Sequence, residues 1–184
     1  LVNGYRAIVV TGAHGKTTTT AMLTRLFIDT GLDPTVFIGG DVDFLGGNAR
    51  LGRGDWAIAE GDESDGSFVH LKPEIAIVNN IDADHLDFYK DLGEIVERFQ
   101  LFIQGIRENG WLLYSADCSH CQALRPPPGR QMLTYGFSES ADVRGVNYRA
   151  EPNRWGCEVV IRGRKAGELQ LAVSGRGHTH NALA

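Results

Sequence analysis

The sequence predicts an α/β fold in which a mostly parallel sheet is flanked by helices and followed by a small antiparallel three-stranded sheet near the C-terminus. Apolar runs without alternation recur up to about residue 115, as expected of strands that are buried on both faces. Helical spacing of apolar residues separates some of these runs. From residue 142 to residue 173 the pattern changes to alternation, which is typical of antiparallel strands.

The predicted elements alternate along the first part of the chain. Gly31 ends the first predicted helix, and glycine-rich residues 41–54 are predicted to form a loop. Strands are predicted at 5–11, 35–38, 56–59, 75–78, 111–114 and 132–137, and helices at 21–28 and 92–106. Within the alternating region, turn residues at 151–153 and 162–164 divide the pattern into three short strands.

Length and composition set limits on the class of protein. The 184 residues suit a single domain, residues 1–184, and 42% hydrophobic with 22% charged residues is ordinary for a globular protein. A net charge of -5 argues against broad binding of nucleic acid, because no basic excess is present to neutralise phosphates. No apolar run approaches the ~20 residues that span a membrane, so no membrane partner is expected.

Three cysteines make no disulfide framework, which favours a cytoplasmic location. Cys118 and Cys121 have the Cys-x-x-Cys spacing of redox pairs and of half zinc sites, but with only Cys157 remaining we interpret them as structural. The chain ends in residues 181–184, which read as the opening of a helix, so we expect a piece of a longer protein.

The strongest functional pattern is a glycine-rich turn between the first strand and the first helix. The turn comprises Gly12, Ala13, His14 and Gly15, and Lys16 and four threonines follow it. Glycines let backbone N–H groups point at phosphate oxygens, a lysine supplies a positive charge, and a threonine hydroxyl can hold Mg²⁺. We therefore predict that residues 12–18, including Thr17 and Thr18, bind a nucleotide phosphate. The two-residue spacing between the glycines is shorter than the usual four, and a plain capped turn is the alternative.

Acidic and imidazole side chains follow two later strands, where the ligands of an open α/β sheet bind. Glu60 comes directly after the strand at 56–59 and begins a run with Asp62, Glu63 and Asp65. A carboxylate there is suited to Mg²⁺, although a solvated acidic turn is the alternative. His85 follows the strand at 75–78 among several aspartates, which favours a metal or general-base role over a structural one.

Several segments together resemble the Mur ligases, which are ATP-dependent amide-bond synthetases of peptidoglycan precursor assembly. Residues 11–19 are similar to the family's short phosphate loop, and 79–87 to the segment that ends in a metal-binding histidine. Residues 59–68 resemble the acidic segment of the alanine-adding branch, and 133–137 a strand before a small antiparallel sheet. The resemblance covers nearly the whole chain and implies a central ATP-binding domain whose N-terminal UDP-sugar-binding and C-terminal partners lie outside it.

The resemblance also implies roles for individual residues. Lys16 would contact the ATP phosphates, Thr17 and Glu60 would hold one Mg²⁺, and His85 would hold a second near the substrate carboxylate. The implied substrates are UDP-N-acetylmuramate and L-alanine, joined through an acyl phosphate, with Asp62, Glu63, Ser64 and Asp65 on the substrate side. Asn181 would contact the adenine. The resemblance implies that this chain binds ATP weakly and catalyses no ligation without the other domains.

Two departures from the family pattern stand out. Many sister ligases carry a carbamylated lysine after the histidine, and this chain has no lysine from Asp91 to Arg164, which fits the alanine-adding branch. Near the C-terminus, Gly177 stands where the family has histidine and His178 where it has asparagine, while Asn181 matches.

Two other functions remain as alternatives. A murein-tripeptide recycling ligase of the same family would share the loop and the histidine, but we would expect tyrosine in place of Ser64. A nucleotide-gated switch of the GTPase type would require an Asn-Lys-x-Asp motif, which residues 79–82 match only loosely because they lack the lysine.

Overall fold

The computed structural model describes residues 1–152 and 154–184, so the turn predicted at 151–153 lies partly outside the described residues. The strands are β1 (Arg6–Thr11), β2 (Thr35–Val42), β3 (Gly47–Arg50), β4 (Trp56–Gly61), β5 (Ile75–Val78), β6 (Trp111–Ser115), β7 (Gln131–Gly136), β8 (Val143–Glu151), β9 (Arg154–Ile161) and β10 (Arg164–Leu171). The α-helices are α1 (Lys16–Asp29), α2 (Leu92–Gln104) and α3 (Arg176–Asn181). Four short 3-10 helices are η1 (Val2–Gly4), η2 (Asp43–Leu45), η3 (Ser67–His70) and η4 (Cys121–Ala123).

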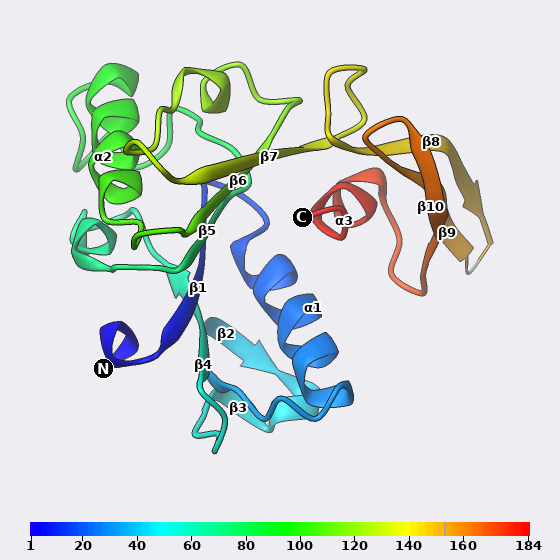
Figure 1. Cartoon of the computed structure of the whole chain (residues 1–184), viewed down its shortest axis with the longest axis horizontal. Helices are drawn as coiled ribbons and strands as arrows, with labels where there is room; N and C mark the ends of the chain where they lie inside the picture. Colours follow the sequence, from blue (N-terminus) through cyan, green and yellow to red (C-terminus); the bar gives the residue numbers. More distant parts are fainter. Residues whose placement is uncertain (153) are drawn as a thin grey trace.

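The strands form one continuous sheet in the order β10-β9-β8-β7-β6-β5-β1-β4-β2-β3 (Figure 1). From β2 to β8 every neighbouring pair is parallel, while β8, β9 and β10 form an antiparallel meander. The predicted fold class is therefore confirmed, with one refinement. The meander continues the main sheet through the pairs Tyr135–Val143 and Gly136–Arg144.

The predicted loop at 41–54 is wrong in part. Strand β2 extends to Val42, and β3 pairs with it antiparallel at the sheet edge. An edge strand that is half exposed needs no apolar pattern, so the Gly-Asn-Ala-Arg sequence of β3 did not allow a strand to be predicted. The helix expected to open at 181–184 is also placed differently, because α3 begins at Arg176 and ends at Asn181.

Helices cover both faces of the central strands (Figure 1). Side chains of β1 alternate between the faces, so Ile8 and Val10 pack with Phe27 of α1 while Val9 joins the cluster under α2. The start of α2 is set by two side-chain hydrogen bonds that resemble a capping box, except that Glu94 bonds the residue before the N-cap. Asp91 accepts a hydrogen bond from the Glu94 N–H at 3.0 Å, and the Glu94 carboxylate accepts one from the N–H of Lys90 at 2.9 Å.

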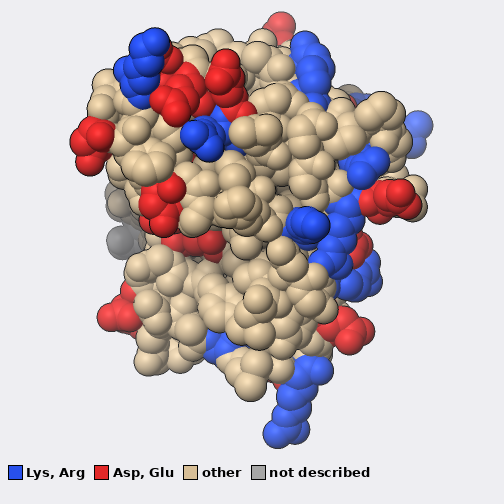
Figure 2. Space-filling model, turned by 90° about the vertical axis from the view of Figure 1, so that its left-hand side faces the viewer, with Lys and Arg blue, Asp and Glu red and all other residues tan. Residues whose placement is uncertain are grey.

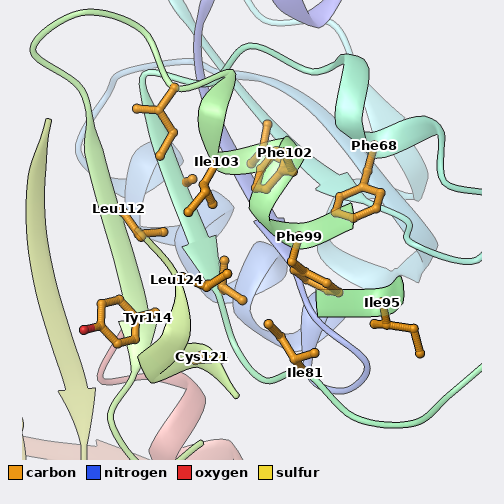
Figure 3. Close-up of a cluster of buried hydrophobic side chains, with 14 of the residues drawn as sticks. Phe68, Ile81, Ile95, Phe99, Phe102, Ile103, Leu112, Tyr114, Cys121 and Leu124 are labelled. Atoms are coloured by element: carbon orange, nitrogen blue, oxygen red, sulfur yellow. The ribbon is translucent and has the colours of Figure 1, made fainter. Parts of the chain in front are cut away.

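The core beneath α2 is built on three phenylalanines (Figure 3). Phe68 of η3 meets Phe99 edge-on at 5.1 Å between ring centroids and lies 5.4 Å from Phe102. All three are at most 1% exposed. This cluster fixes the acidic segment that precedes η3 against the sheet, because η3 carries Phe68 into the core.

Charged side chains of both signs are interspersed over the face shown in Figure 2, with uncharged areas between them. Among the described residues, none of the helices combines the length and apolar character needed to cross a membrane.

Candidate functional site

The phosphate-binding loop predicted at residues 12–15 joins β1 to α1, at the carboxyl edge of the sheet. Gly12 has φ +132°, and a Cβ there would lie 2.8 Å from the carbonyl oxygen of Asn80. Gly15 is left-handed at φ +84° and caps α1, which begins at Lys16. Glycine is required at both positions, and the N-terminus of α1 faces the loop, as anion binding needs.

Two asparagines at the end of β5 hold this loop in place. Asn80 accepts a hydrogen bond from the His14 N–H at 2.8 Å and donates one to the His14 carbonyl at 2.9 Å. Asn79 is 1% exposed, donates to the Thr19 hydroxyl at 3.1 Å and accepts from the Tyr135 hydroxyl at 2.8 Å. Sequence reasoning missed this role. The available signal was their position directly after a buried parallel strand, where polar side chains meet the neighbouring loops.

Lys16 lies inside the loop and is paired with a buried acid. Its ammonium donates hydrogen bonds to the Gly12 carbonyl at 2.9 Å and to Oε1 of Glu63 at 2.9 Å. The side chains of Lys16 and Glu63 are 16% and 3% exposed. His85 adds a third member, since its Nε2 lies 3.7 Å from the same Oε1. The structure therefore joins three predicted site residues from three separate segments.

Glu60 and Thr17 lie in the same open cleft as Lys16 and His85. Oε2 of Glu60 accepts a hydrogen bond from the Gly39 N–H at 2.7 Å, while its Oε1 is buried without a partner among the described residues. An orphaned carboxylate oxygen in the same cleft as a threonine suits a hard cation such as Mg²⁺. The described residues contain no preformed group of three or more His, Cys, Asp or Glu ligands. Magnesium sites that use phosphates and waters as further ligands do not need one.

The acidic segment divides between different environments. Asp62 and Ser64 line the cleft, and the Asp62 carboxylate accepts a hydrogen bond from the Ser64 N–H at 3.0 Å. Asp65 is not among the cleft residues and accepts from the Ser67 N–H at 2.8 Å, with hydrogen bonds from Ser67 lowering its pKa. Thr18 also lies elsewhere, along an apolar groove between α1 and β10. The structure thus brings Asp62 and Ser64 to the cleft but neither Asp65 nor Thr18.

Asn181 of α3 packs against the phosphate loop. A Cβ on Gly15 would lie 2.6 Å from the Asn181 side-chain nitrogen, so the amide covers this glycine. At the two positions that depart from the family pattern, Gly177 lines a separate pocket, and His178 Nδ1 lies 2.7 Å from the Ser174 carbonyl.

That separate pocket is lined by aromatic and charged side chains that sequence reasoning did not single out. The Arg176 guanidinium lies 4.4 Å from the centre of the Phe137 ring, and the His180 ring lies 6.1 Å from it. His180 Nε2 is 3.0 Å from the Ser115 hydroxyl and 3.4 Å from the Asp117 carboxylate. Burial lowers the pKa of His180, against the opposing effect of Asp117. A planar heteroaromatic ring matches this combination of stacking and polar groups.

Cys118 and Cys121 lie beside the segment that leads to His85. Cys121 is fully buried in η4, and Sγ of Cys118 accepts a hydrogen bond from the Ile81 N–H at 3.4 Å. A hydrogen bond from the Cys121 thiol lowers the pKa of Cys118 to about 5. Both are free cysteines in this structure.

Comparisons with known proteins show which family this chain resembles. Residues 10–184 match the family model described as the Mur ligase middle domain. The UDP-N-acetylmuramate–L-alanine ligase of Syntrophotalea carbinolica is 45% identical over 177 residues, which are 96% of this chain and 39% of that protein. The corresponding ligase of Aquifex aeolicus is 39% identical with the same two coverages. The chain thus spans about 39% of the length of these relatives.

Solved structures show the same fold. The UDP-N-acetylmuramate-alanine ligase from Thermotoga maritima superposes with a TM-score of 0.85 at 29% identity, covering 97% of this chain and 40% of that one. A UDP-N-acetylmuramate:L-alanyl-gamma-D-glutamyl-meso-diaminopimelate ligase from Neisseria meningitides also gives 0.85, at 26% identity, with 100% and 60% coverage.

Proposed function

This chain belongs to the Mur ligase family as its middle domain, and from that premise we propose that the full-length protein joins L-alanine to UDP-N-acetylmuramate with ATP as the energy source. The observation that carries the proposal is the meeting of Lys16, Glu60 and His85 in one cleft, beside a loop whose geometry suits a phosphate. Identity of 39–45% to alanine-adding ligases supports the choice of substrates.

The chemistry requires two steps. The substrate carboxylate attacks the γ-phosphorus of ATP, forming an acyl phosphate and releasing ADP. The alanine amine then attacks the acyl carbon, and phosphate leaves as the amide forms and the amine loses its proton. Lys16 and the loop N–H groups would hold the phosphates in place for the first step. This positioning is the chain's main contribution, because phosphoryl transfer depends chiefly on orientation and charge neutralisation.

Thr17, Glu60 and His85 are the residues that would hold magnesium in this cleft. When bound, the metal would neutralise the negative charge that otherwise keeps the γ-phosphate and the carboxylate apart. We assign the nucleobase of ATP to the pocket of Phe137, Arg176 and His180. The Asn181 side chain instead packs against Gly15 of the phosphate loop. Asn181 would then act on nucleotide binding through Gly15 and not through the adenine.

The proposal extends to the whole protein. We propose that the full-length chain carries further domains for the UDP sugar and the amino acid, since this chain spans 39% of its relatives. Three free cysteines fit a reducing compartment, so a cytoplasmic location is part of the proposal. The side chains of Asn79 and Asn80 both donate hydrogen bonds to the His14 carbonyl of the phosphate loop, which argues against their use as a guanine-reading motif.

The test is an activity assay on the full-length protein. ATP, UDP-N-acetylmuramate and L-alanine together should release phosphate, and omission of any one should abolish it. Lys16→Met should lower kcat/KM by at least about a thousandfold if it removes phosphate stabilisation. A preference for the murein tripeptide over L-alanine would establish the recycling function instead, and ligation by residues 1–184 alone would contradict the need for further domains.

A further inference from the structure

Glu63 has surroundings that its position in an acidic run does not predict. Its side chain is 3% exposed, whereas its neighbours Asp62 and Asp65 are exposed. Its Oε1 accepts the hydrogen bond from Lys16, and its Oε2 is buried without a partner among the described residues. Tyr89 secures the backbone, because its hydroxyl donates to the Glu63 carbonyl. Glu63 is therefore a fixed, half-satisfied carboxylate inside the phosphate site.

The pairing leaves little free positive charge for a phosphate. Lys16 is the only lysine or arginine that lines the cleft among the described residues, and Glu63 already compensates it. Glu60 and Asp62 add further negative charge to the same cleft. A bare nucleotide must therefore separate a buried ion pair and approach uncompensated carboxylates.

Separating that pair is costly because it leaves the buried Glu63 carboxylate with only the His85 ring beside it, 3.7 Å from Oε1. A divalent cation that arrives with the nucleotide would offset this cost, since it would bring two positive charges into the cleft. The free-energy cost of separating Lys16 from Glu63 thus depends on whether a divalent cation accompanies the nucleotide.

We propose that Glu63 is a positioning residue that makes nucleotide binding conditional on a divalent cation. Its carboxylate holds Lys16 when the site is empty, and a nucleotide draws Lys16 away readily only when a cation comes with it. This inference rests on the proposed function, because it assumes that Lys16 binds nucleotide phosphates.

A purely structural role for Glu63 predicts the opposite change in nucleotide affinity when its charge is removed. If Glu63 only orients the Lys16 side chain for phosphate binding, removing its charge weakens nucleotide binding both with and without metal. If it competes with phosphates for Lys16, neutralisation strengthens binding of the metal-free nucleotide. Glu63→Gln separates these cases, because the amide keeps the size of the side chain and removes only its charge.

The experiment measures ADP binding to the 184-residue chain by calorimetry, once with Mg²⁺ and once with EDTA. The wild-type chain should bind ADP at least about tenfold more tightly with Mg²⁺. Glu63→Gln should bind metal-free ADP about tenfold more tightly than the wild type does, which reduces its dependence on Mg²⁺. Glu63→Asp, which keeps the charge, should retain the wild-type dependence on Mg²⁺. Glu97→Gln removes the same charge from an exposed site on α2 and should match the wild type.

The outcomes separate the two proposals. Wild-type binding of Mg·ADP together with unchanged metal-free affinity in Glu63→Gln overturns the inference and leaves the proposed function standing. Equal weakening in both conditions assigns Glu63 a structural role only. Equal affinity of the wild-type chain for ADP with and without Mg²⁺ overturns the inference without any variant. The inference can therefore be tested even if Glu63→Gln does not fold. No binding of Mg·ADP by the folded wild-type chain counts against both proposals.

Discussion

At the scale of single residues, the phosphate loop depends on side chains outside it. The glycines allow the turn, but Asn80 fixes the backbone of His14 by two hydrogen bonds. Asn79 donates a further one to the His14 carbonyl at 3.4 Å and accepts one from the Tyr135 hydroxyl. An anion site of this kind is useful only if its N–H groups already point inward, because reorganising them would reduce the gain from binding. The amides at the end of β5 thus contribute to preorganisation of the loop.

Replacing Asn80 by alanine tests this contribution. Asn80→Ala removes both hydrogen bonds to His14 and should lower the free energy of unfolding by about 1–2 kcal/mol. Urea denaturation measures the change. Asn48→Ala, at an exposed position on β3, is the control and should stay within about 0.5 kcal/mol of the wild type. Equal stability of the two variants would mean that water replaces Asn80 at no cost.

His180 predicts a specific dependence of stability on pH. Burial lowers its pKa, so the folded state resists protonation that an unfolded histidine undergoes near pH ~6.5. The stabilisation is therefore fully present above that pH and is lost as the pH falls toward the lowered folded-state value. We expect the urea midpoint to fall more steeply between pH 7.5 and 5.5 in the wild type than in His180→Gln. Parallel curves would show that His180 does not contribute, and His70→Gln, at an exposed site, is the matched control.

At the scale of elements, α2 stabilises the site indirectly. Its phenylalanines pack on Phe68, which follows the acidic segment that carries Glu60 and Glu63. Loss of this packing would loosen η3, the adjacent acidic segment and, through Tyr89, the backbone at Glu63. Helix α2 thus stabilises the positions of Glu60 and Glu63 through the packing of its phenylalanines on Phe68.

Phe102→Ala should destabilise the protein by about 3–5 kcal/mol, because Phe102 is fully buried and its removal leaves a cavity. Leu101→Ala is the matched control from the same helix, since Leu101 is 54% exposed and its loss should cost less than about 0.5 kcal/mol. Chemical denaturation monitored by circular dichroism gives both values. Similar losses for the two variants would contradict the packing described for α2.

Sequence patterns predicted the strands that are buried on both faces and the alternating strands near the C-terminus, but missed the polar edge strand β3. Strand β5 is apolar throughout, and β1 and β4 each contain an uninterrupted apolar run, so their positions could be predicted from these runs. The edge strand β3 is polar and escaped detection. The residues near the phosphate loop were predictable because they follow strand ends, but the burial of Glu63 and the stacking around Phe137 depend on contacts between distant segments.

At the scale of the whole molecule, the sheet has two unequal parts. The parallel part is covered by α1 and α2. The meander of β8 to β10 is paired with it at only two residue pairs, and Cys157 of β9 packs in the same core cluster as Ile8 (Figure 1). Side chains along β10 are exposed or half-buried throughout. Few buried apolar contacts lower the free energy of local opening, so the two parts should differ in stability.

Amide hydrogen exchange measures this difference. Backbone amides of β1, β4 and β5 should exchange at least about tenfold more slowly than those of β10, because the central strands open only with the whole core. The hydrogen-bonded amides of β9, which lie between two strands, should be intermediate. Uniform protection across all ten strands would indicate one cooperative unit.

The central place of β1 has a consequence for the way the protein is made. Arg6 pairs with Trp56 and Ile8 with Ile75, so β1 leaves the ribosome long before either neighbouring strand has been translated. Pairing between distant segments is slow, and unpaired apolar strands are prone to aggregate. The nascent chain therefore exposes Ile8, Val9 and Val10 until β5 emerges. Chaperone binding to this early segment would improve the yield of folded protein more than binding to the late, polar meander.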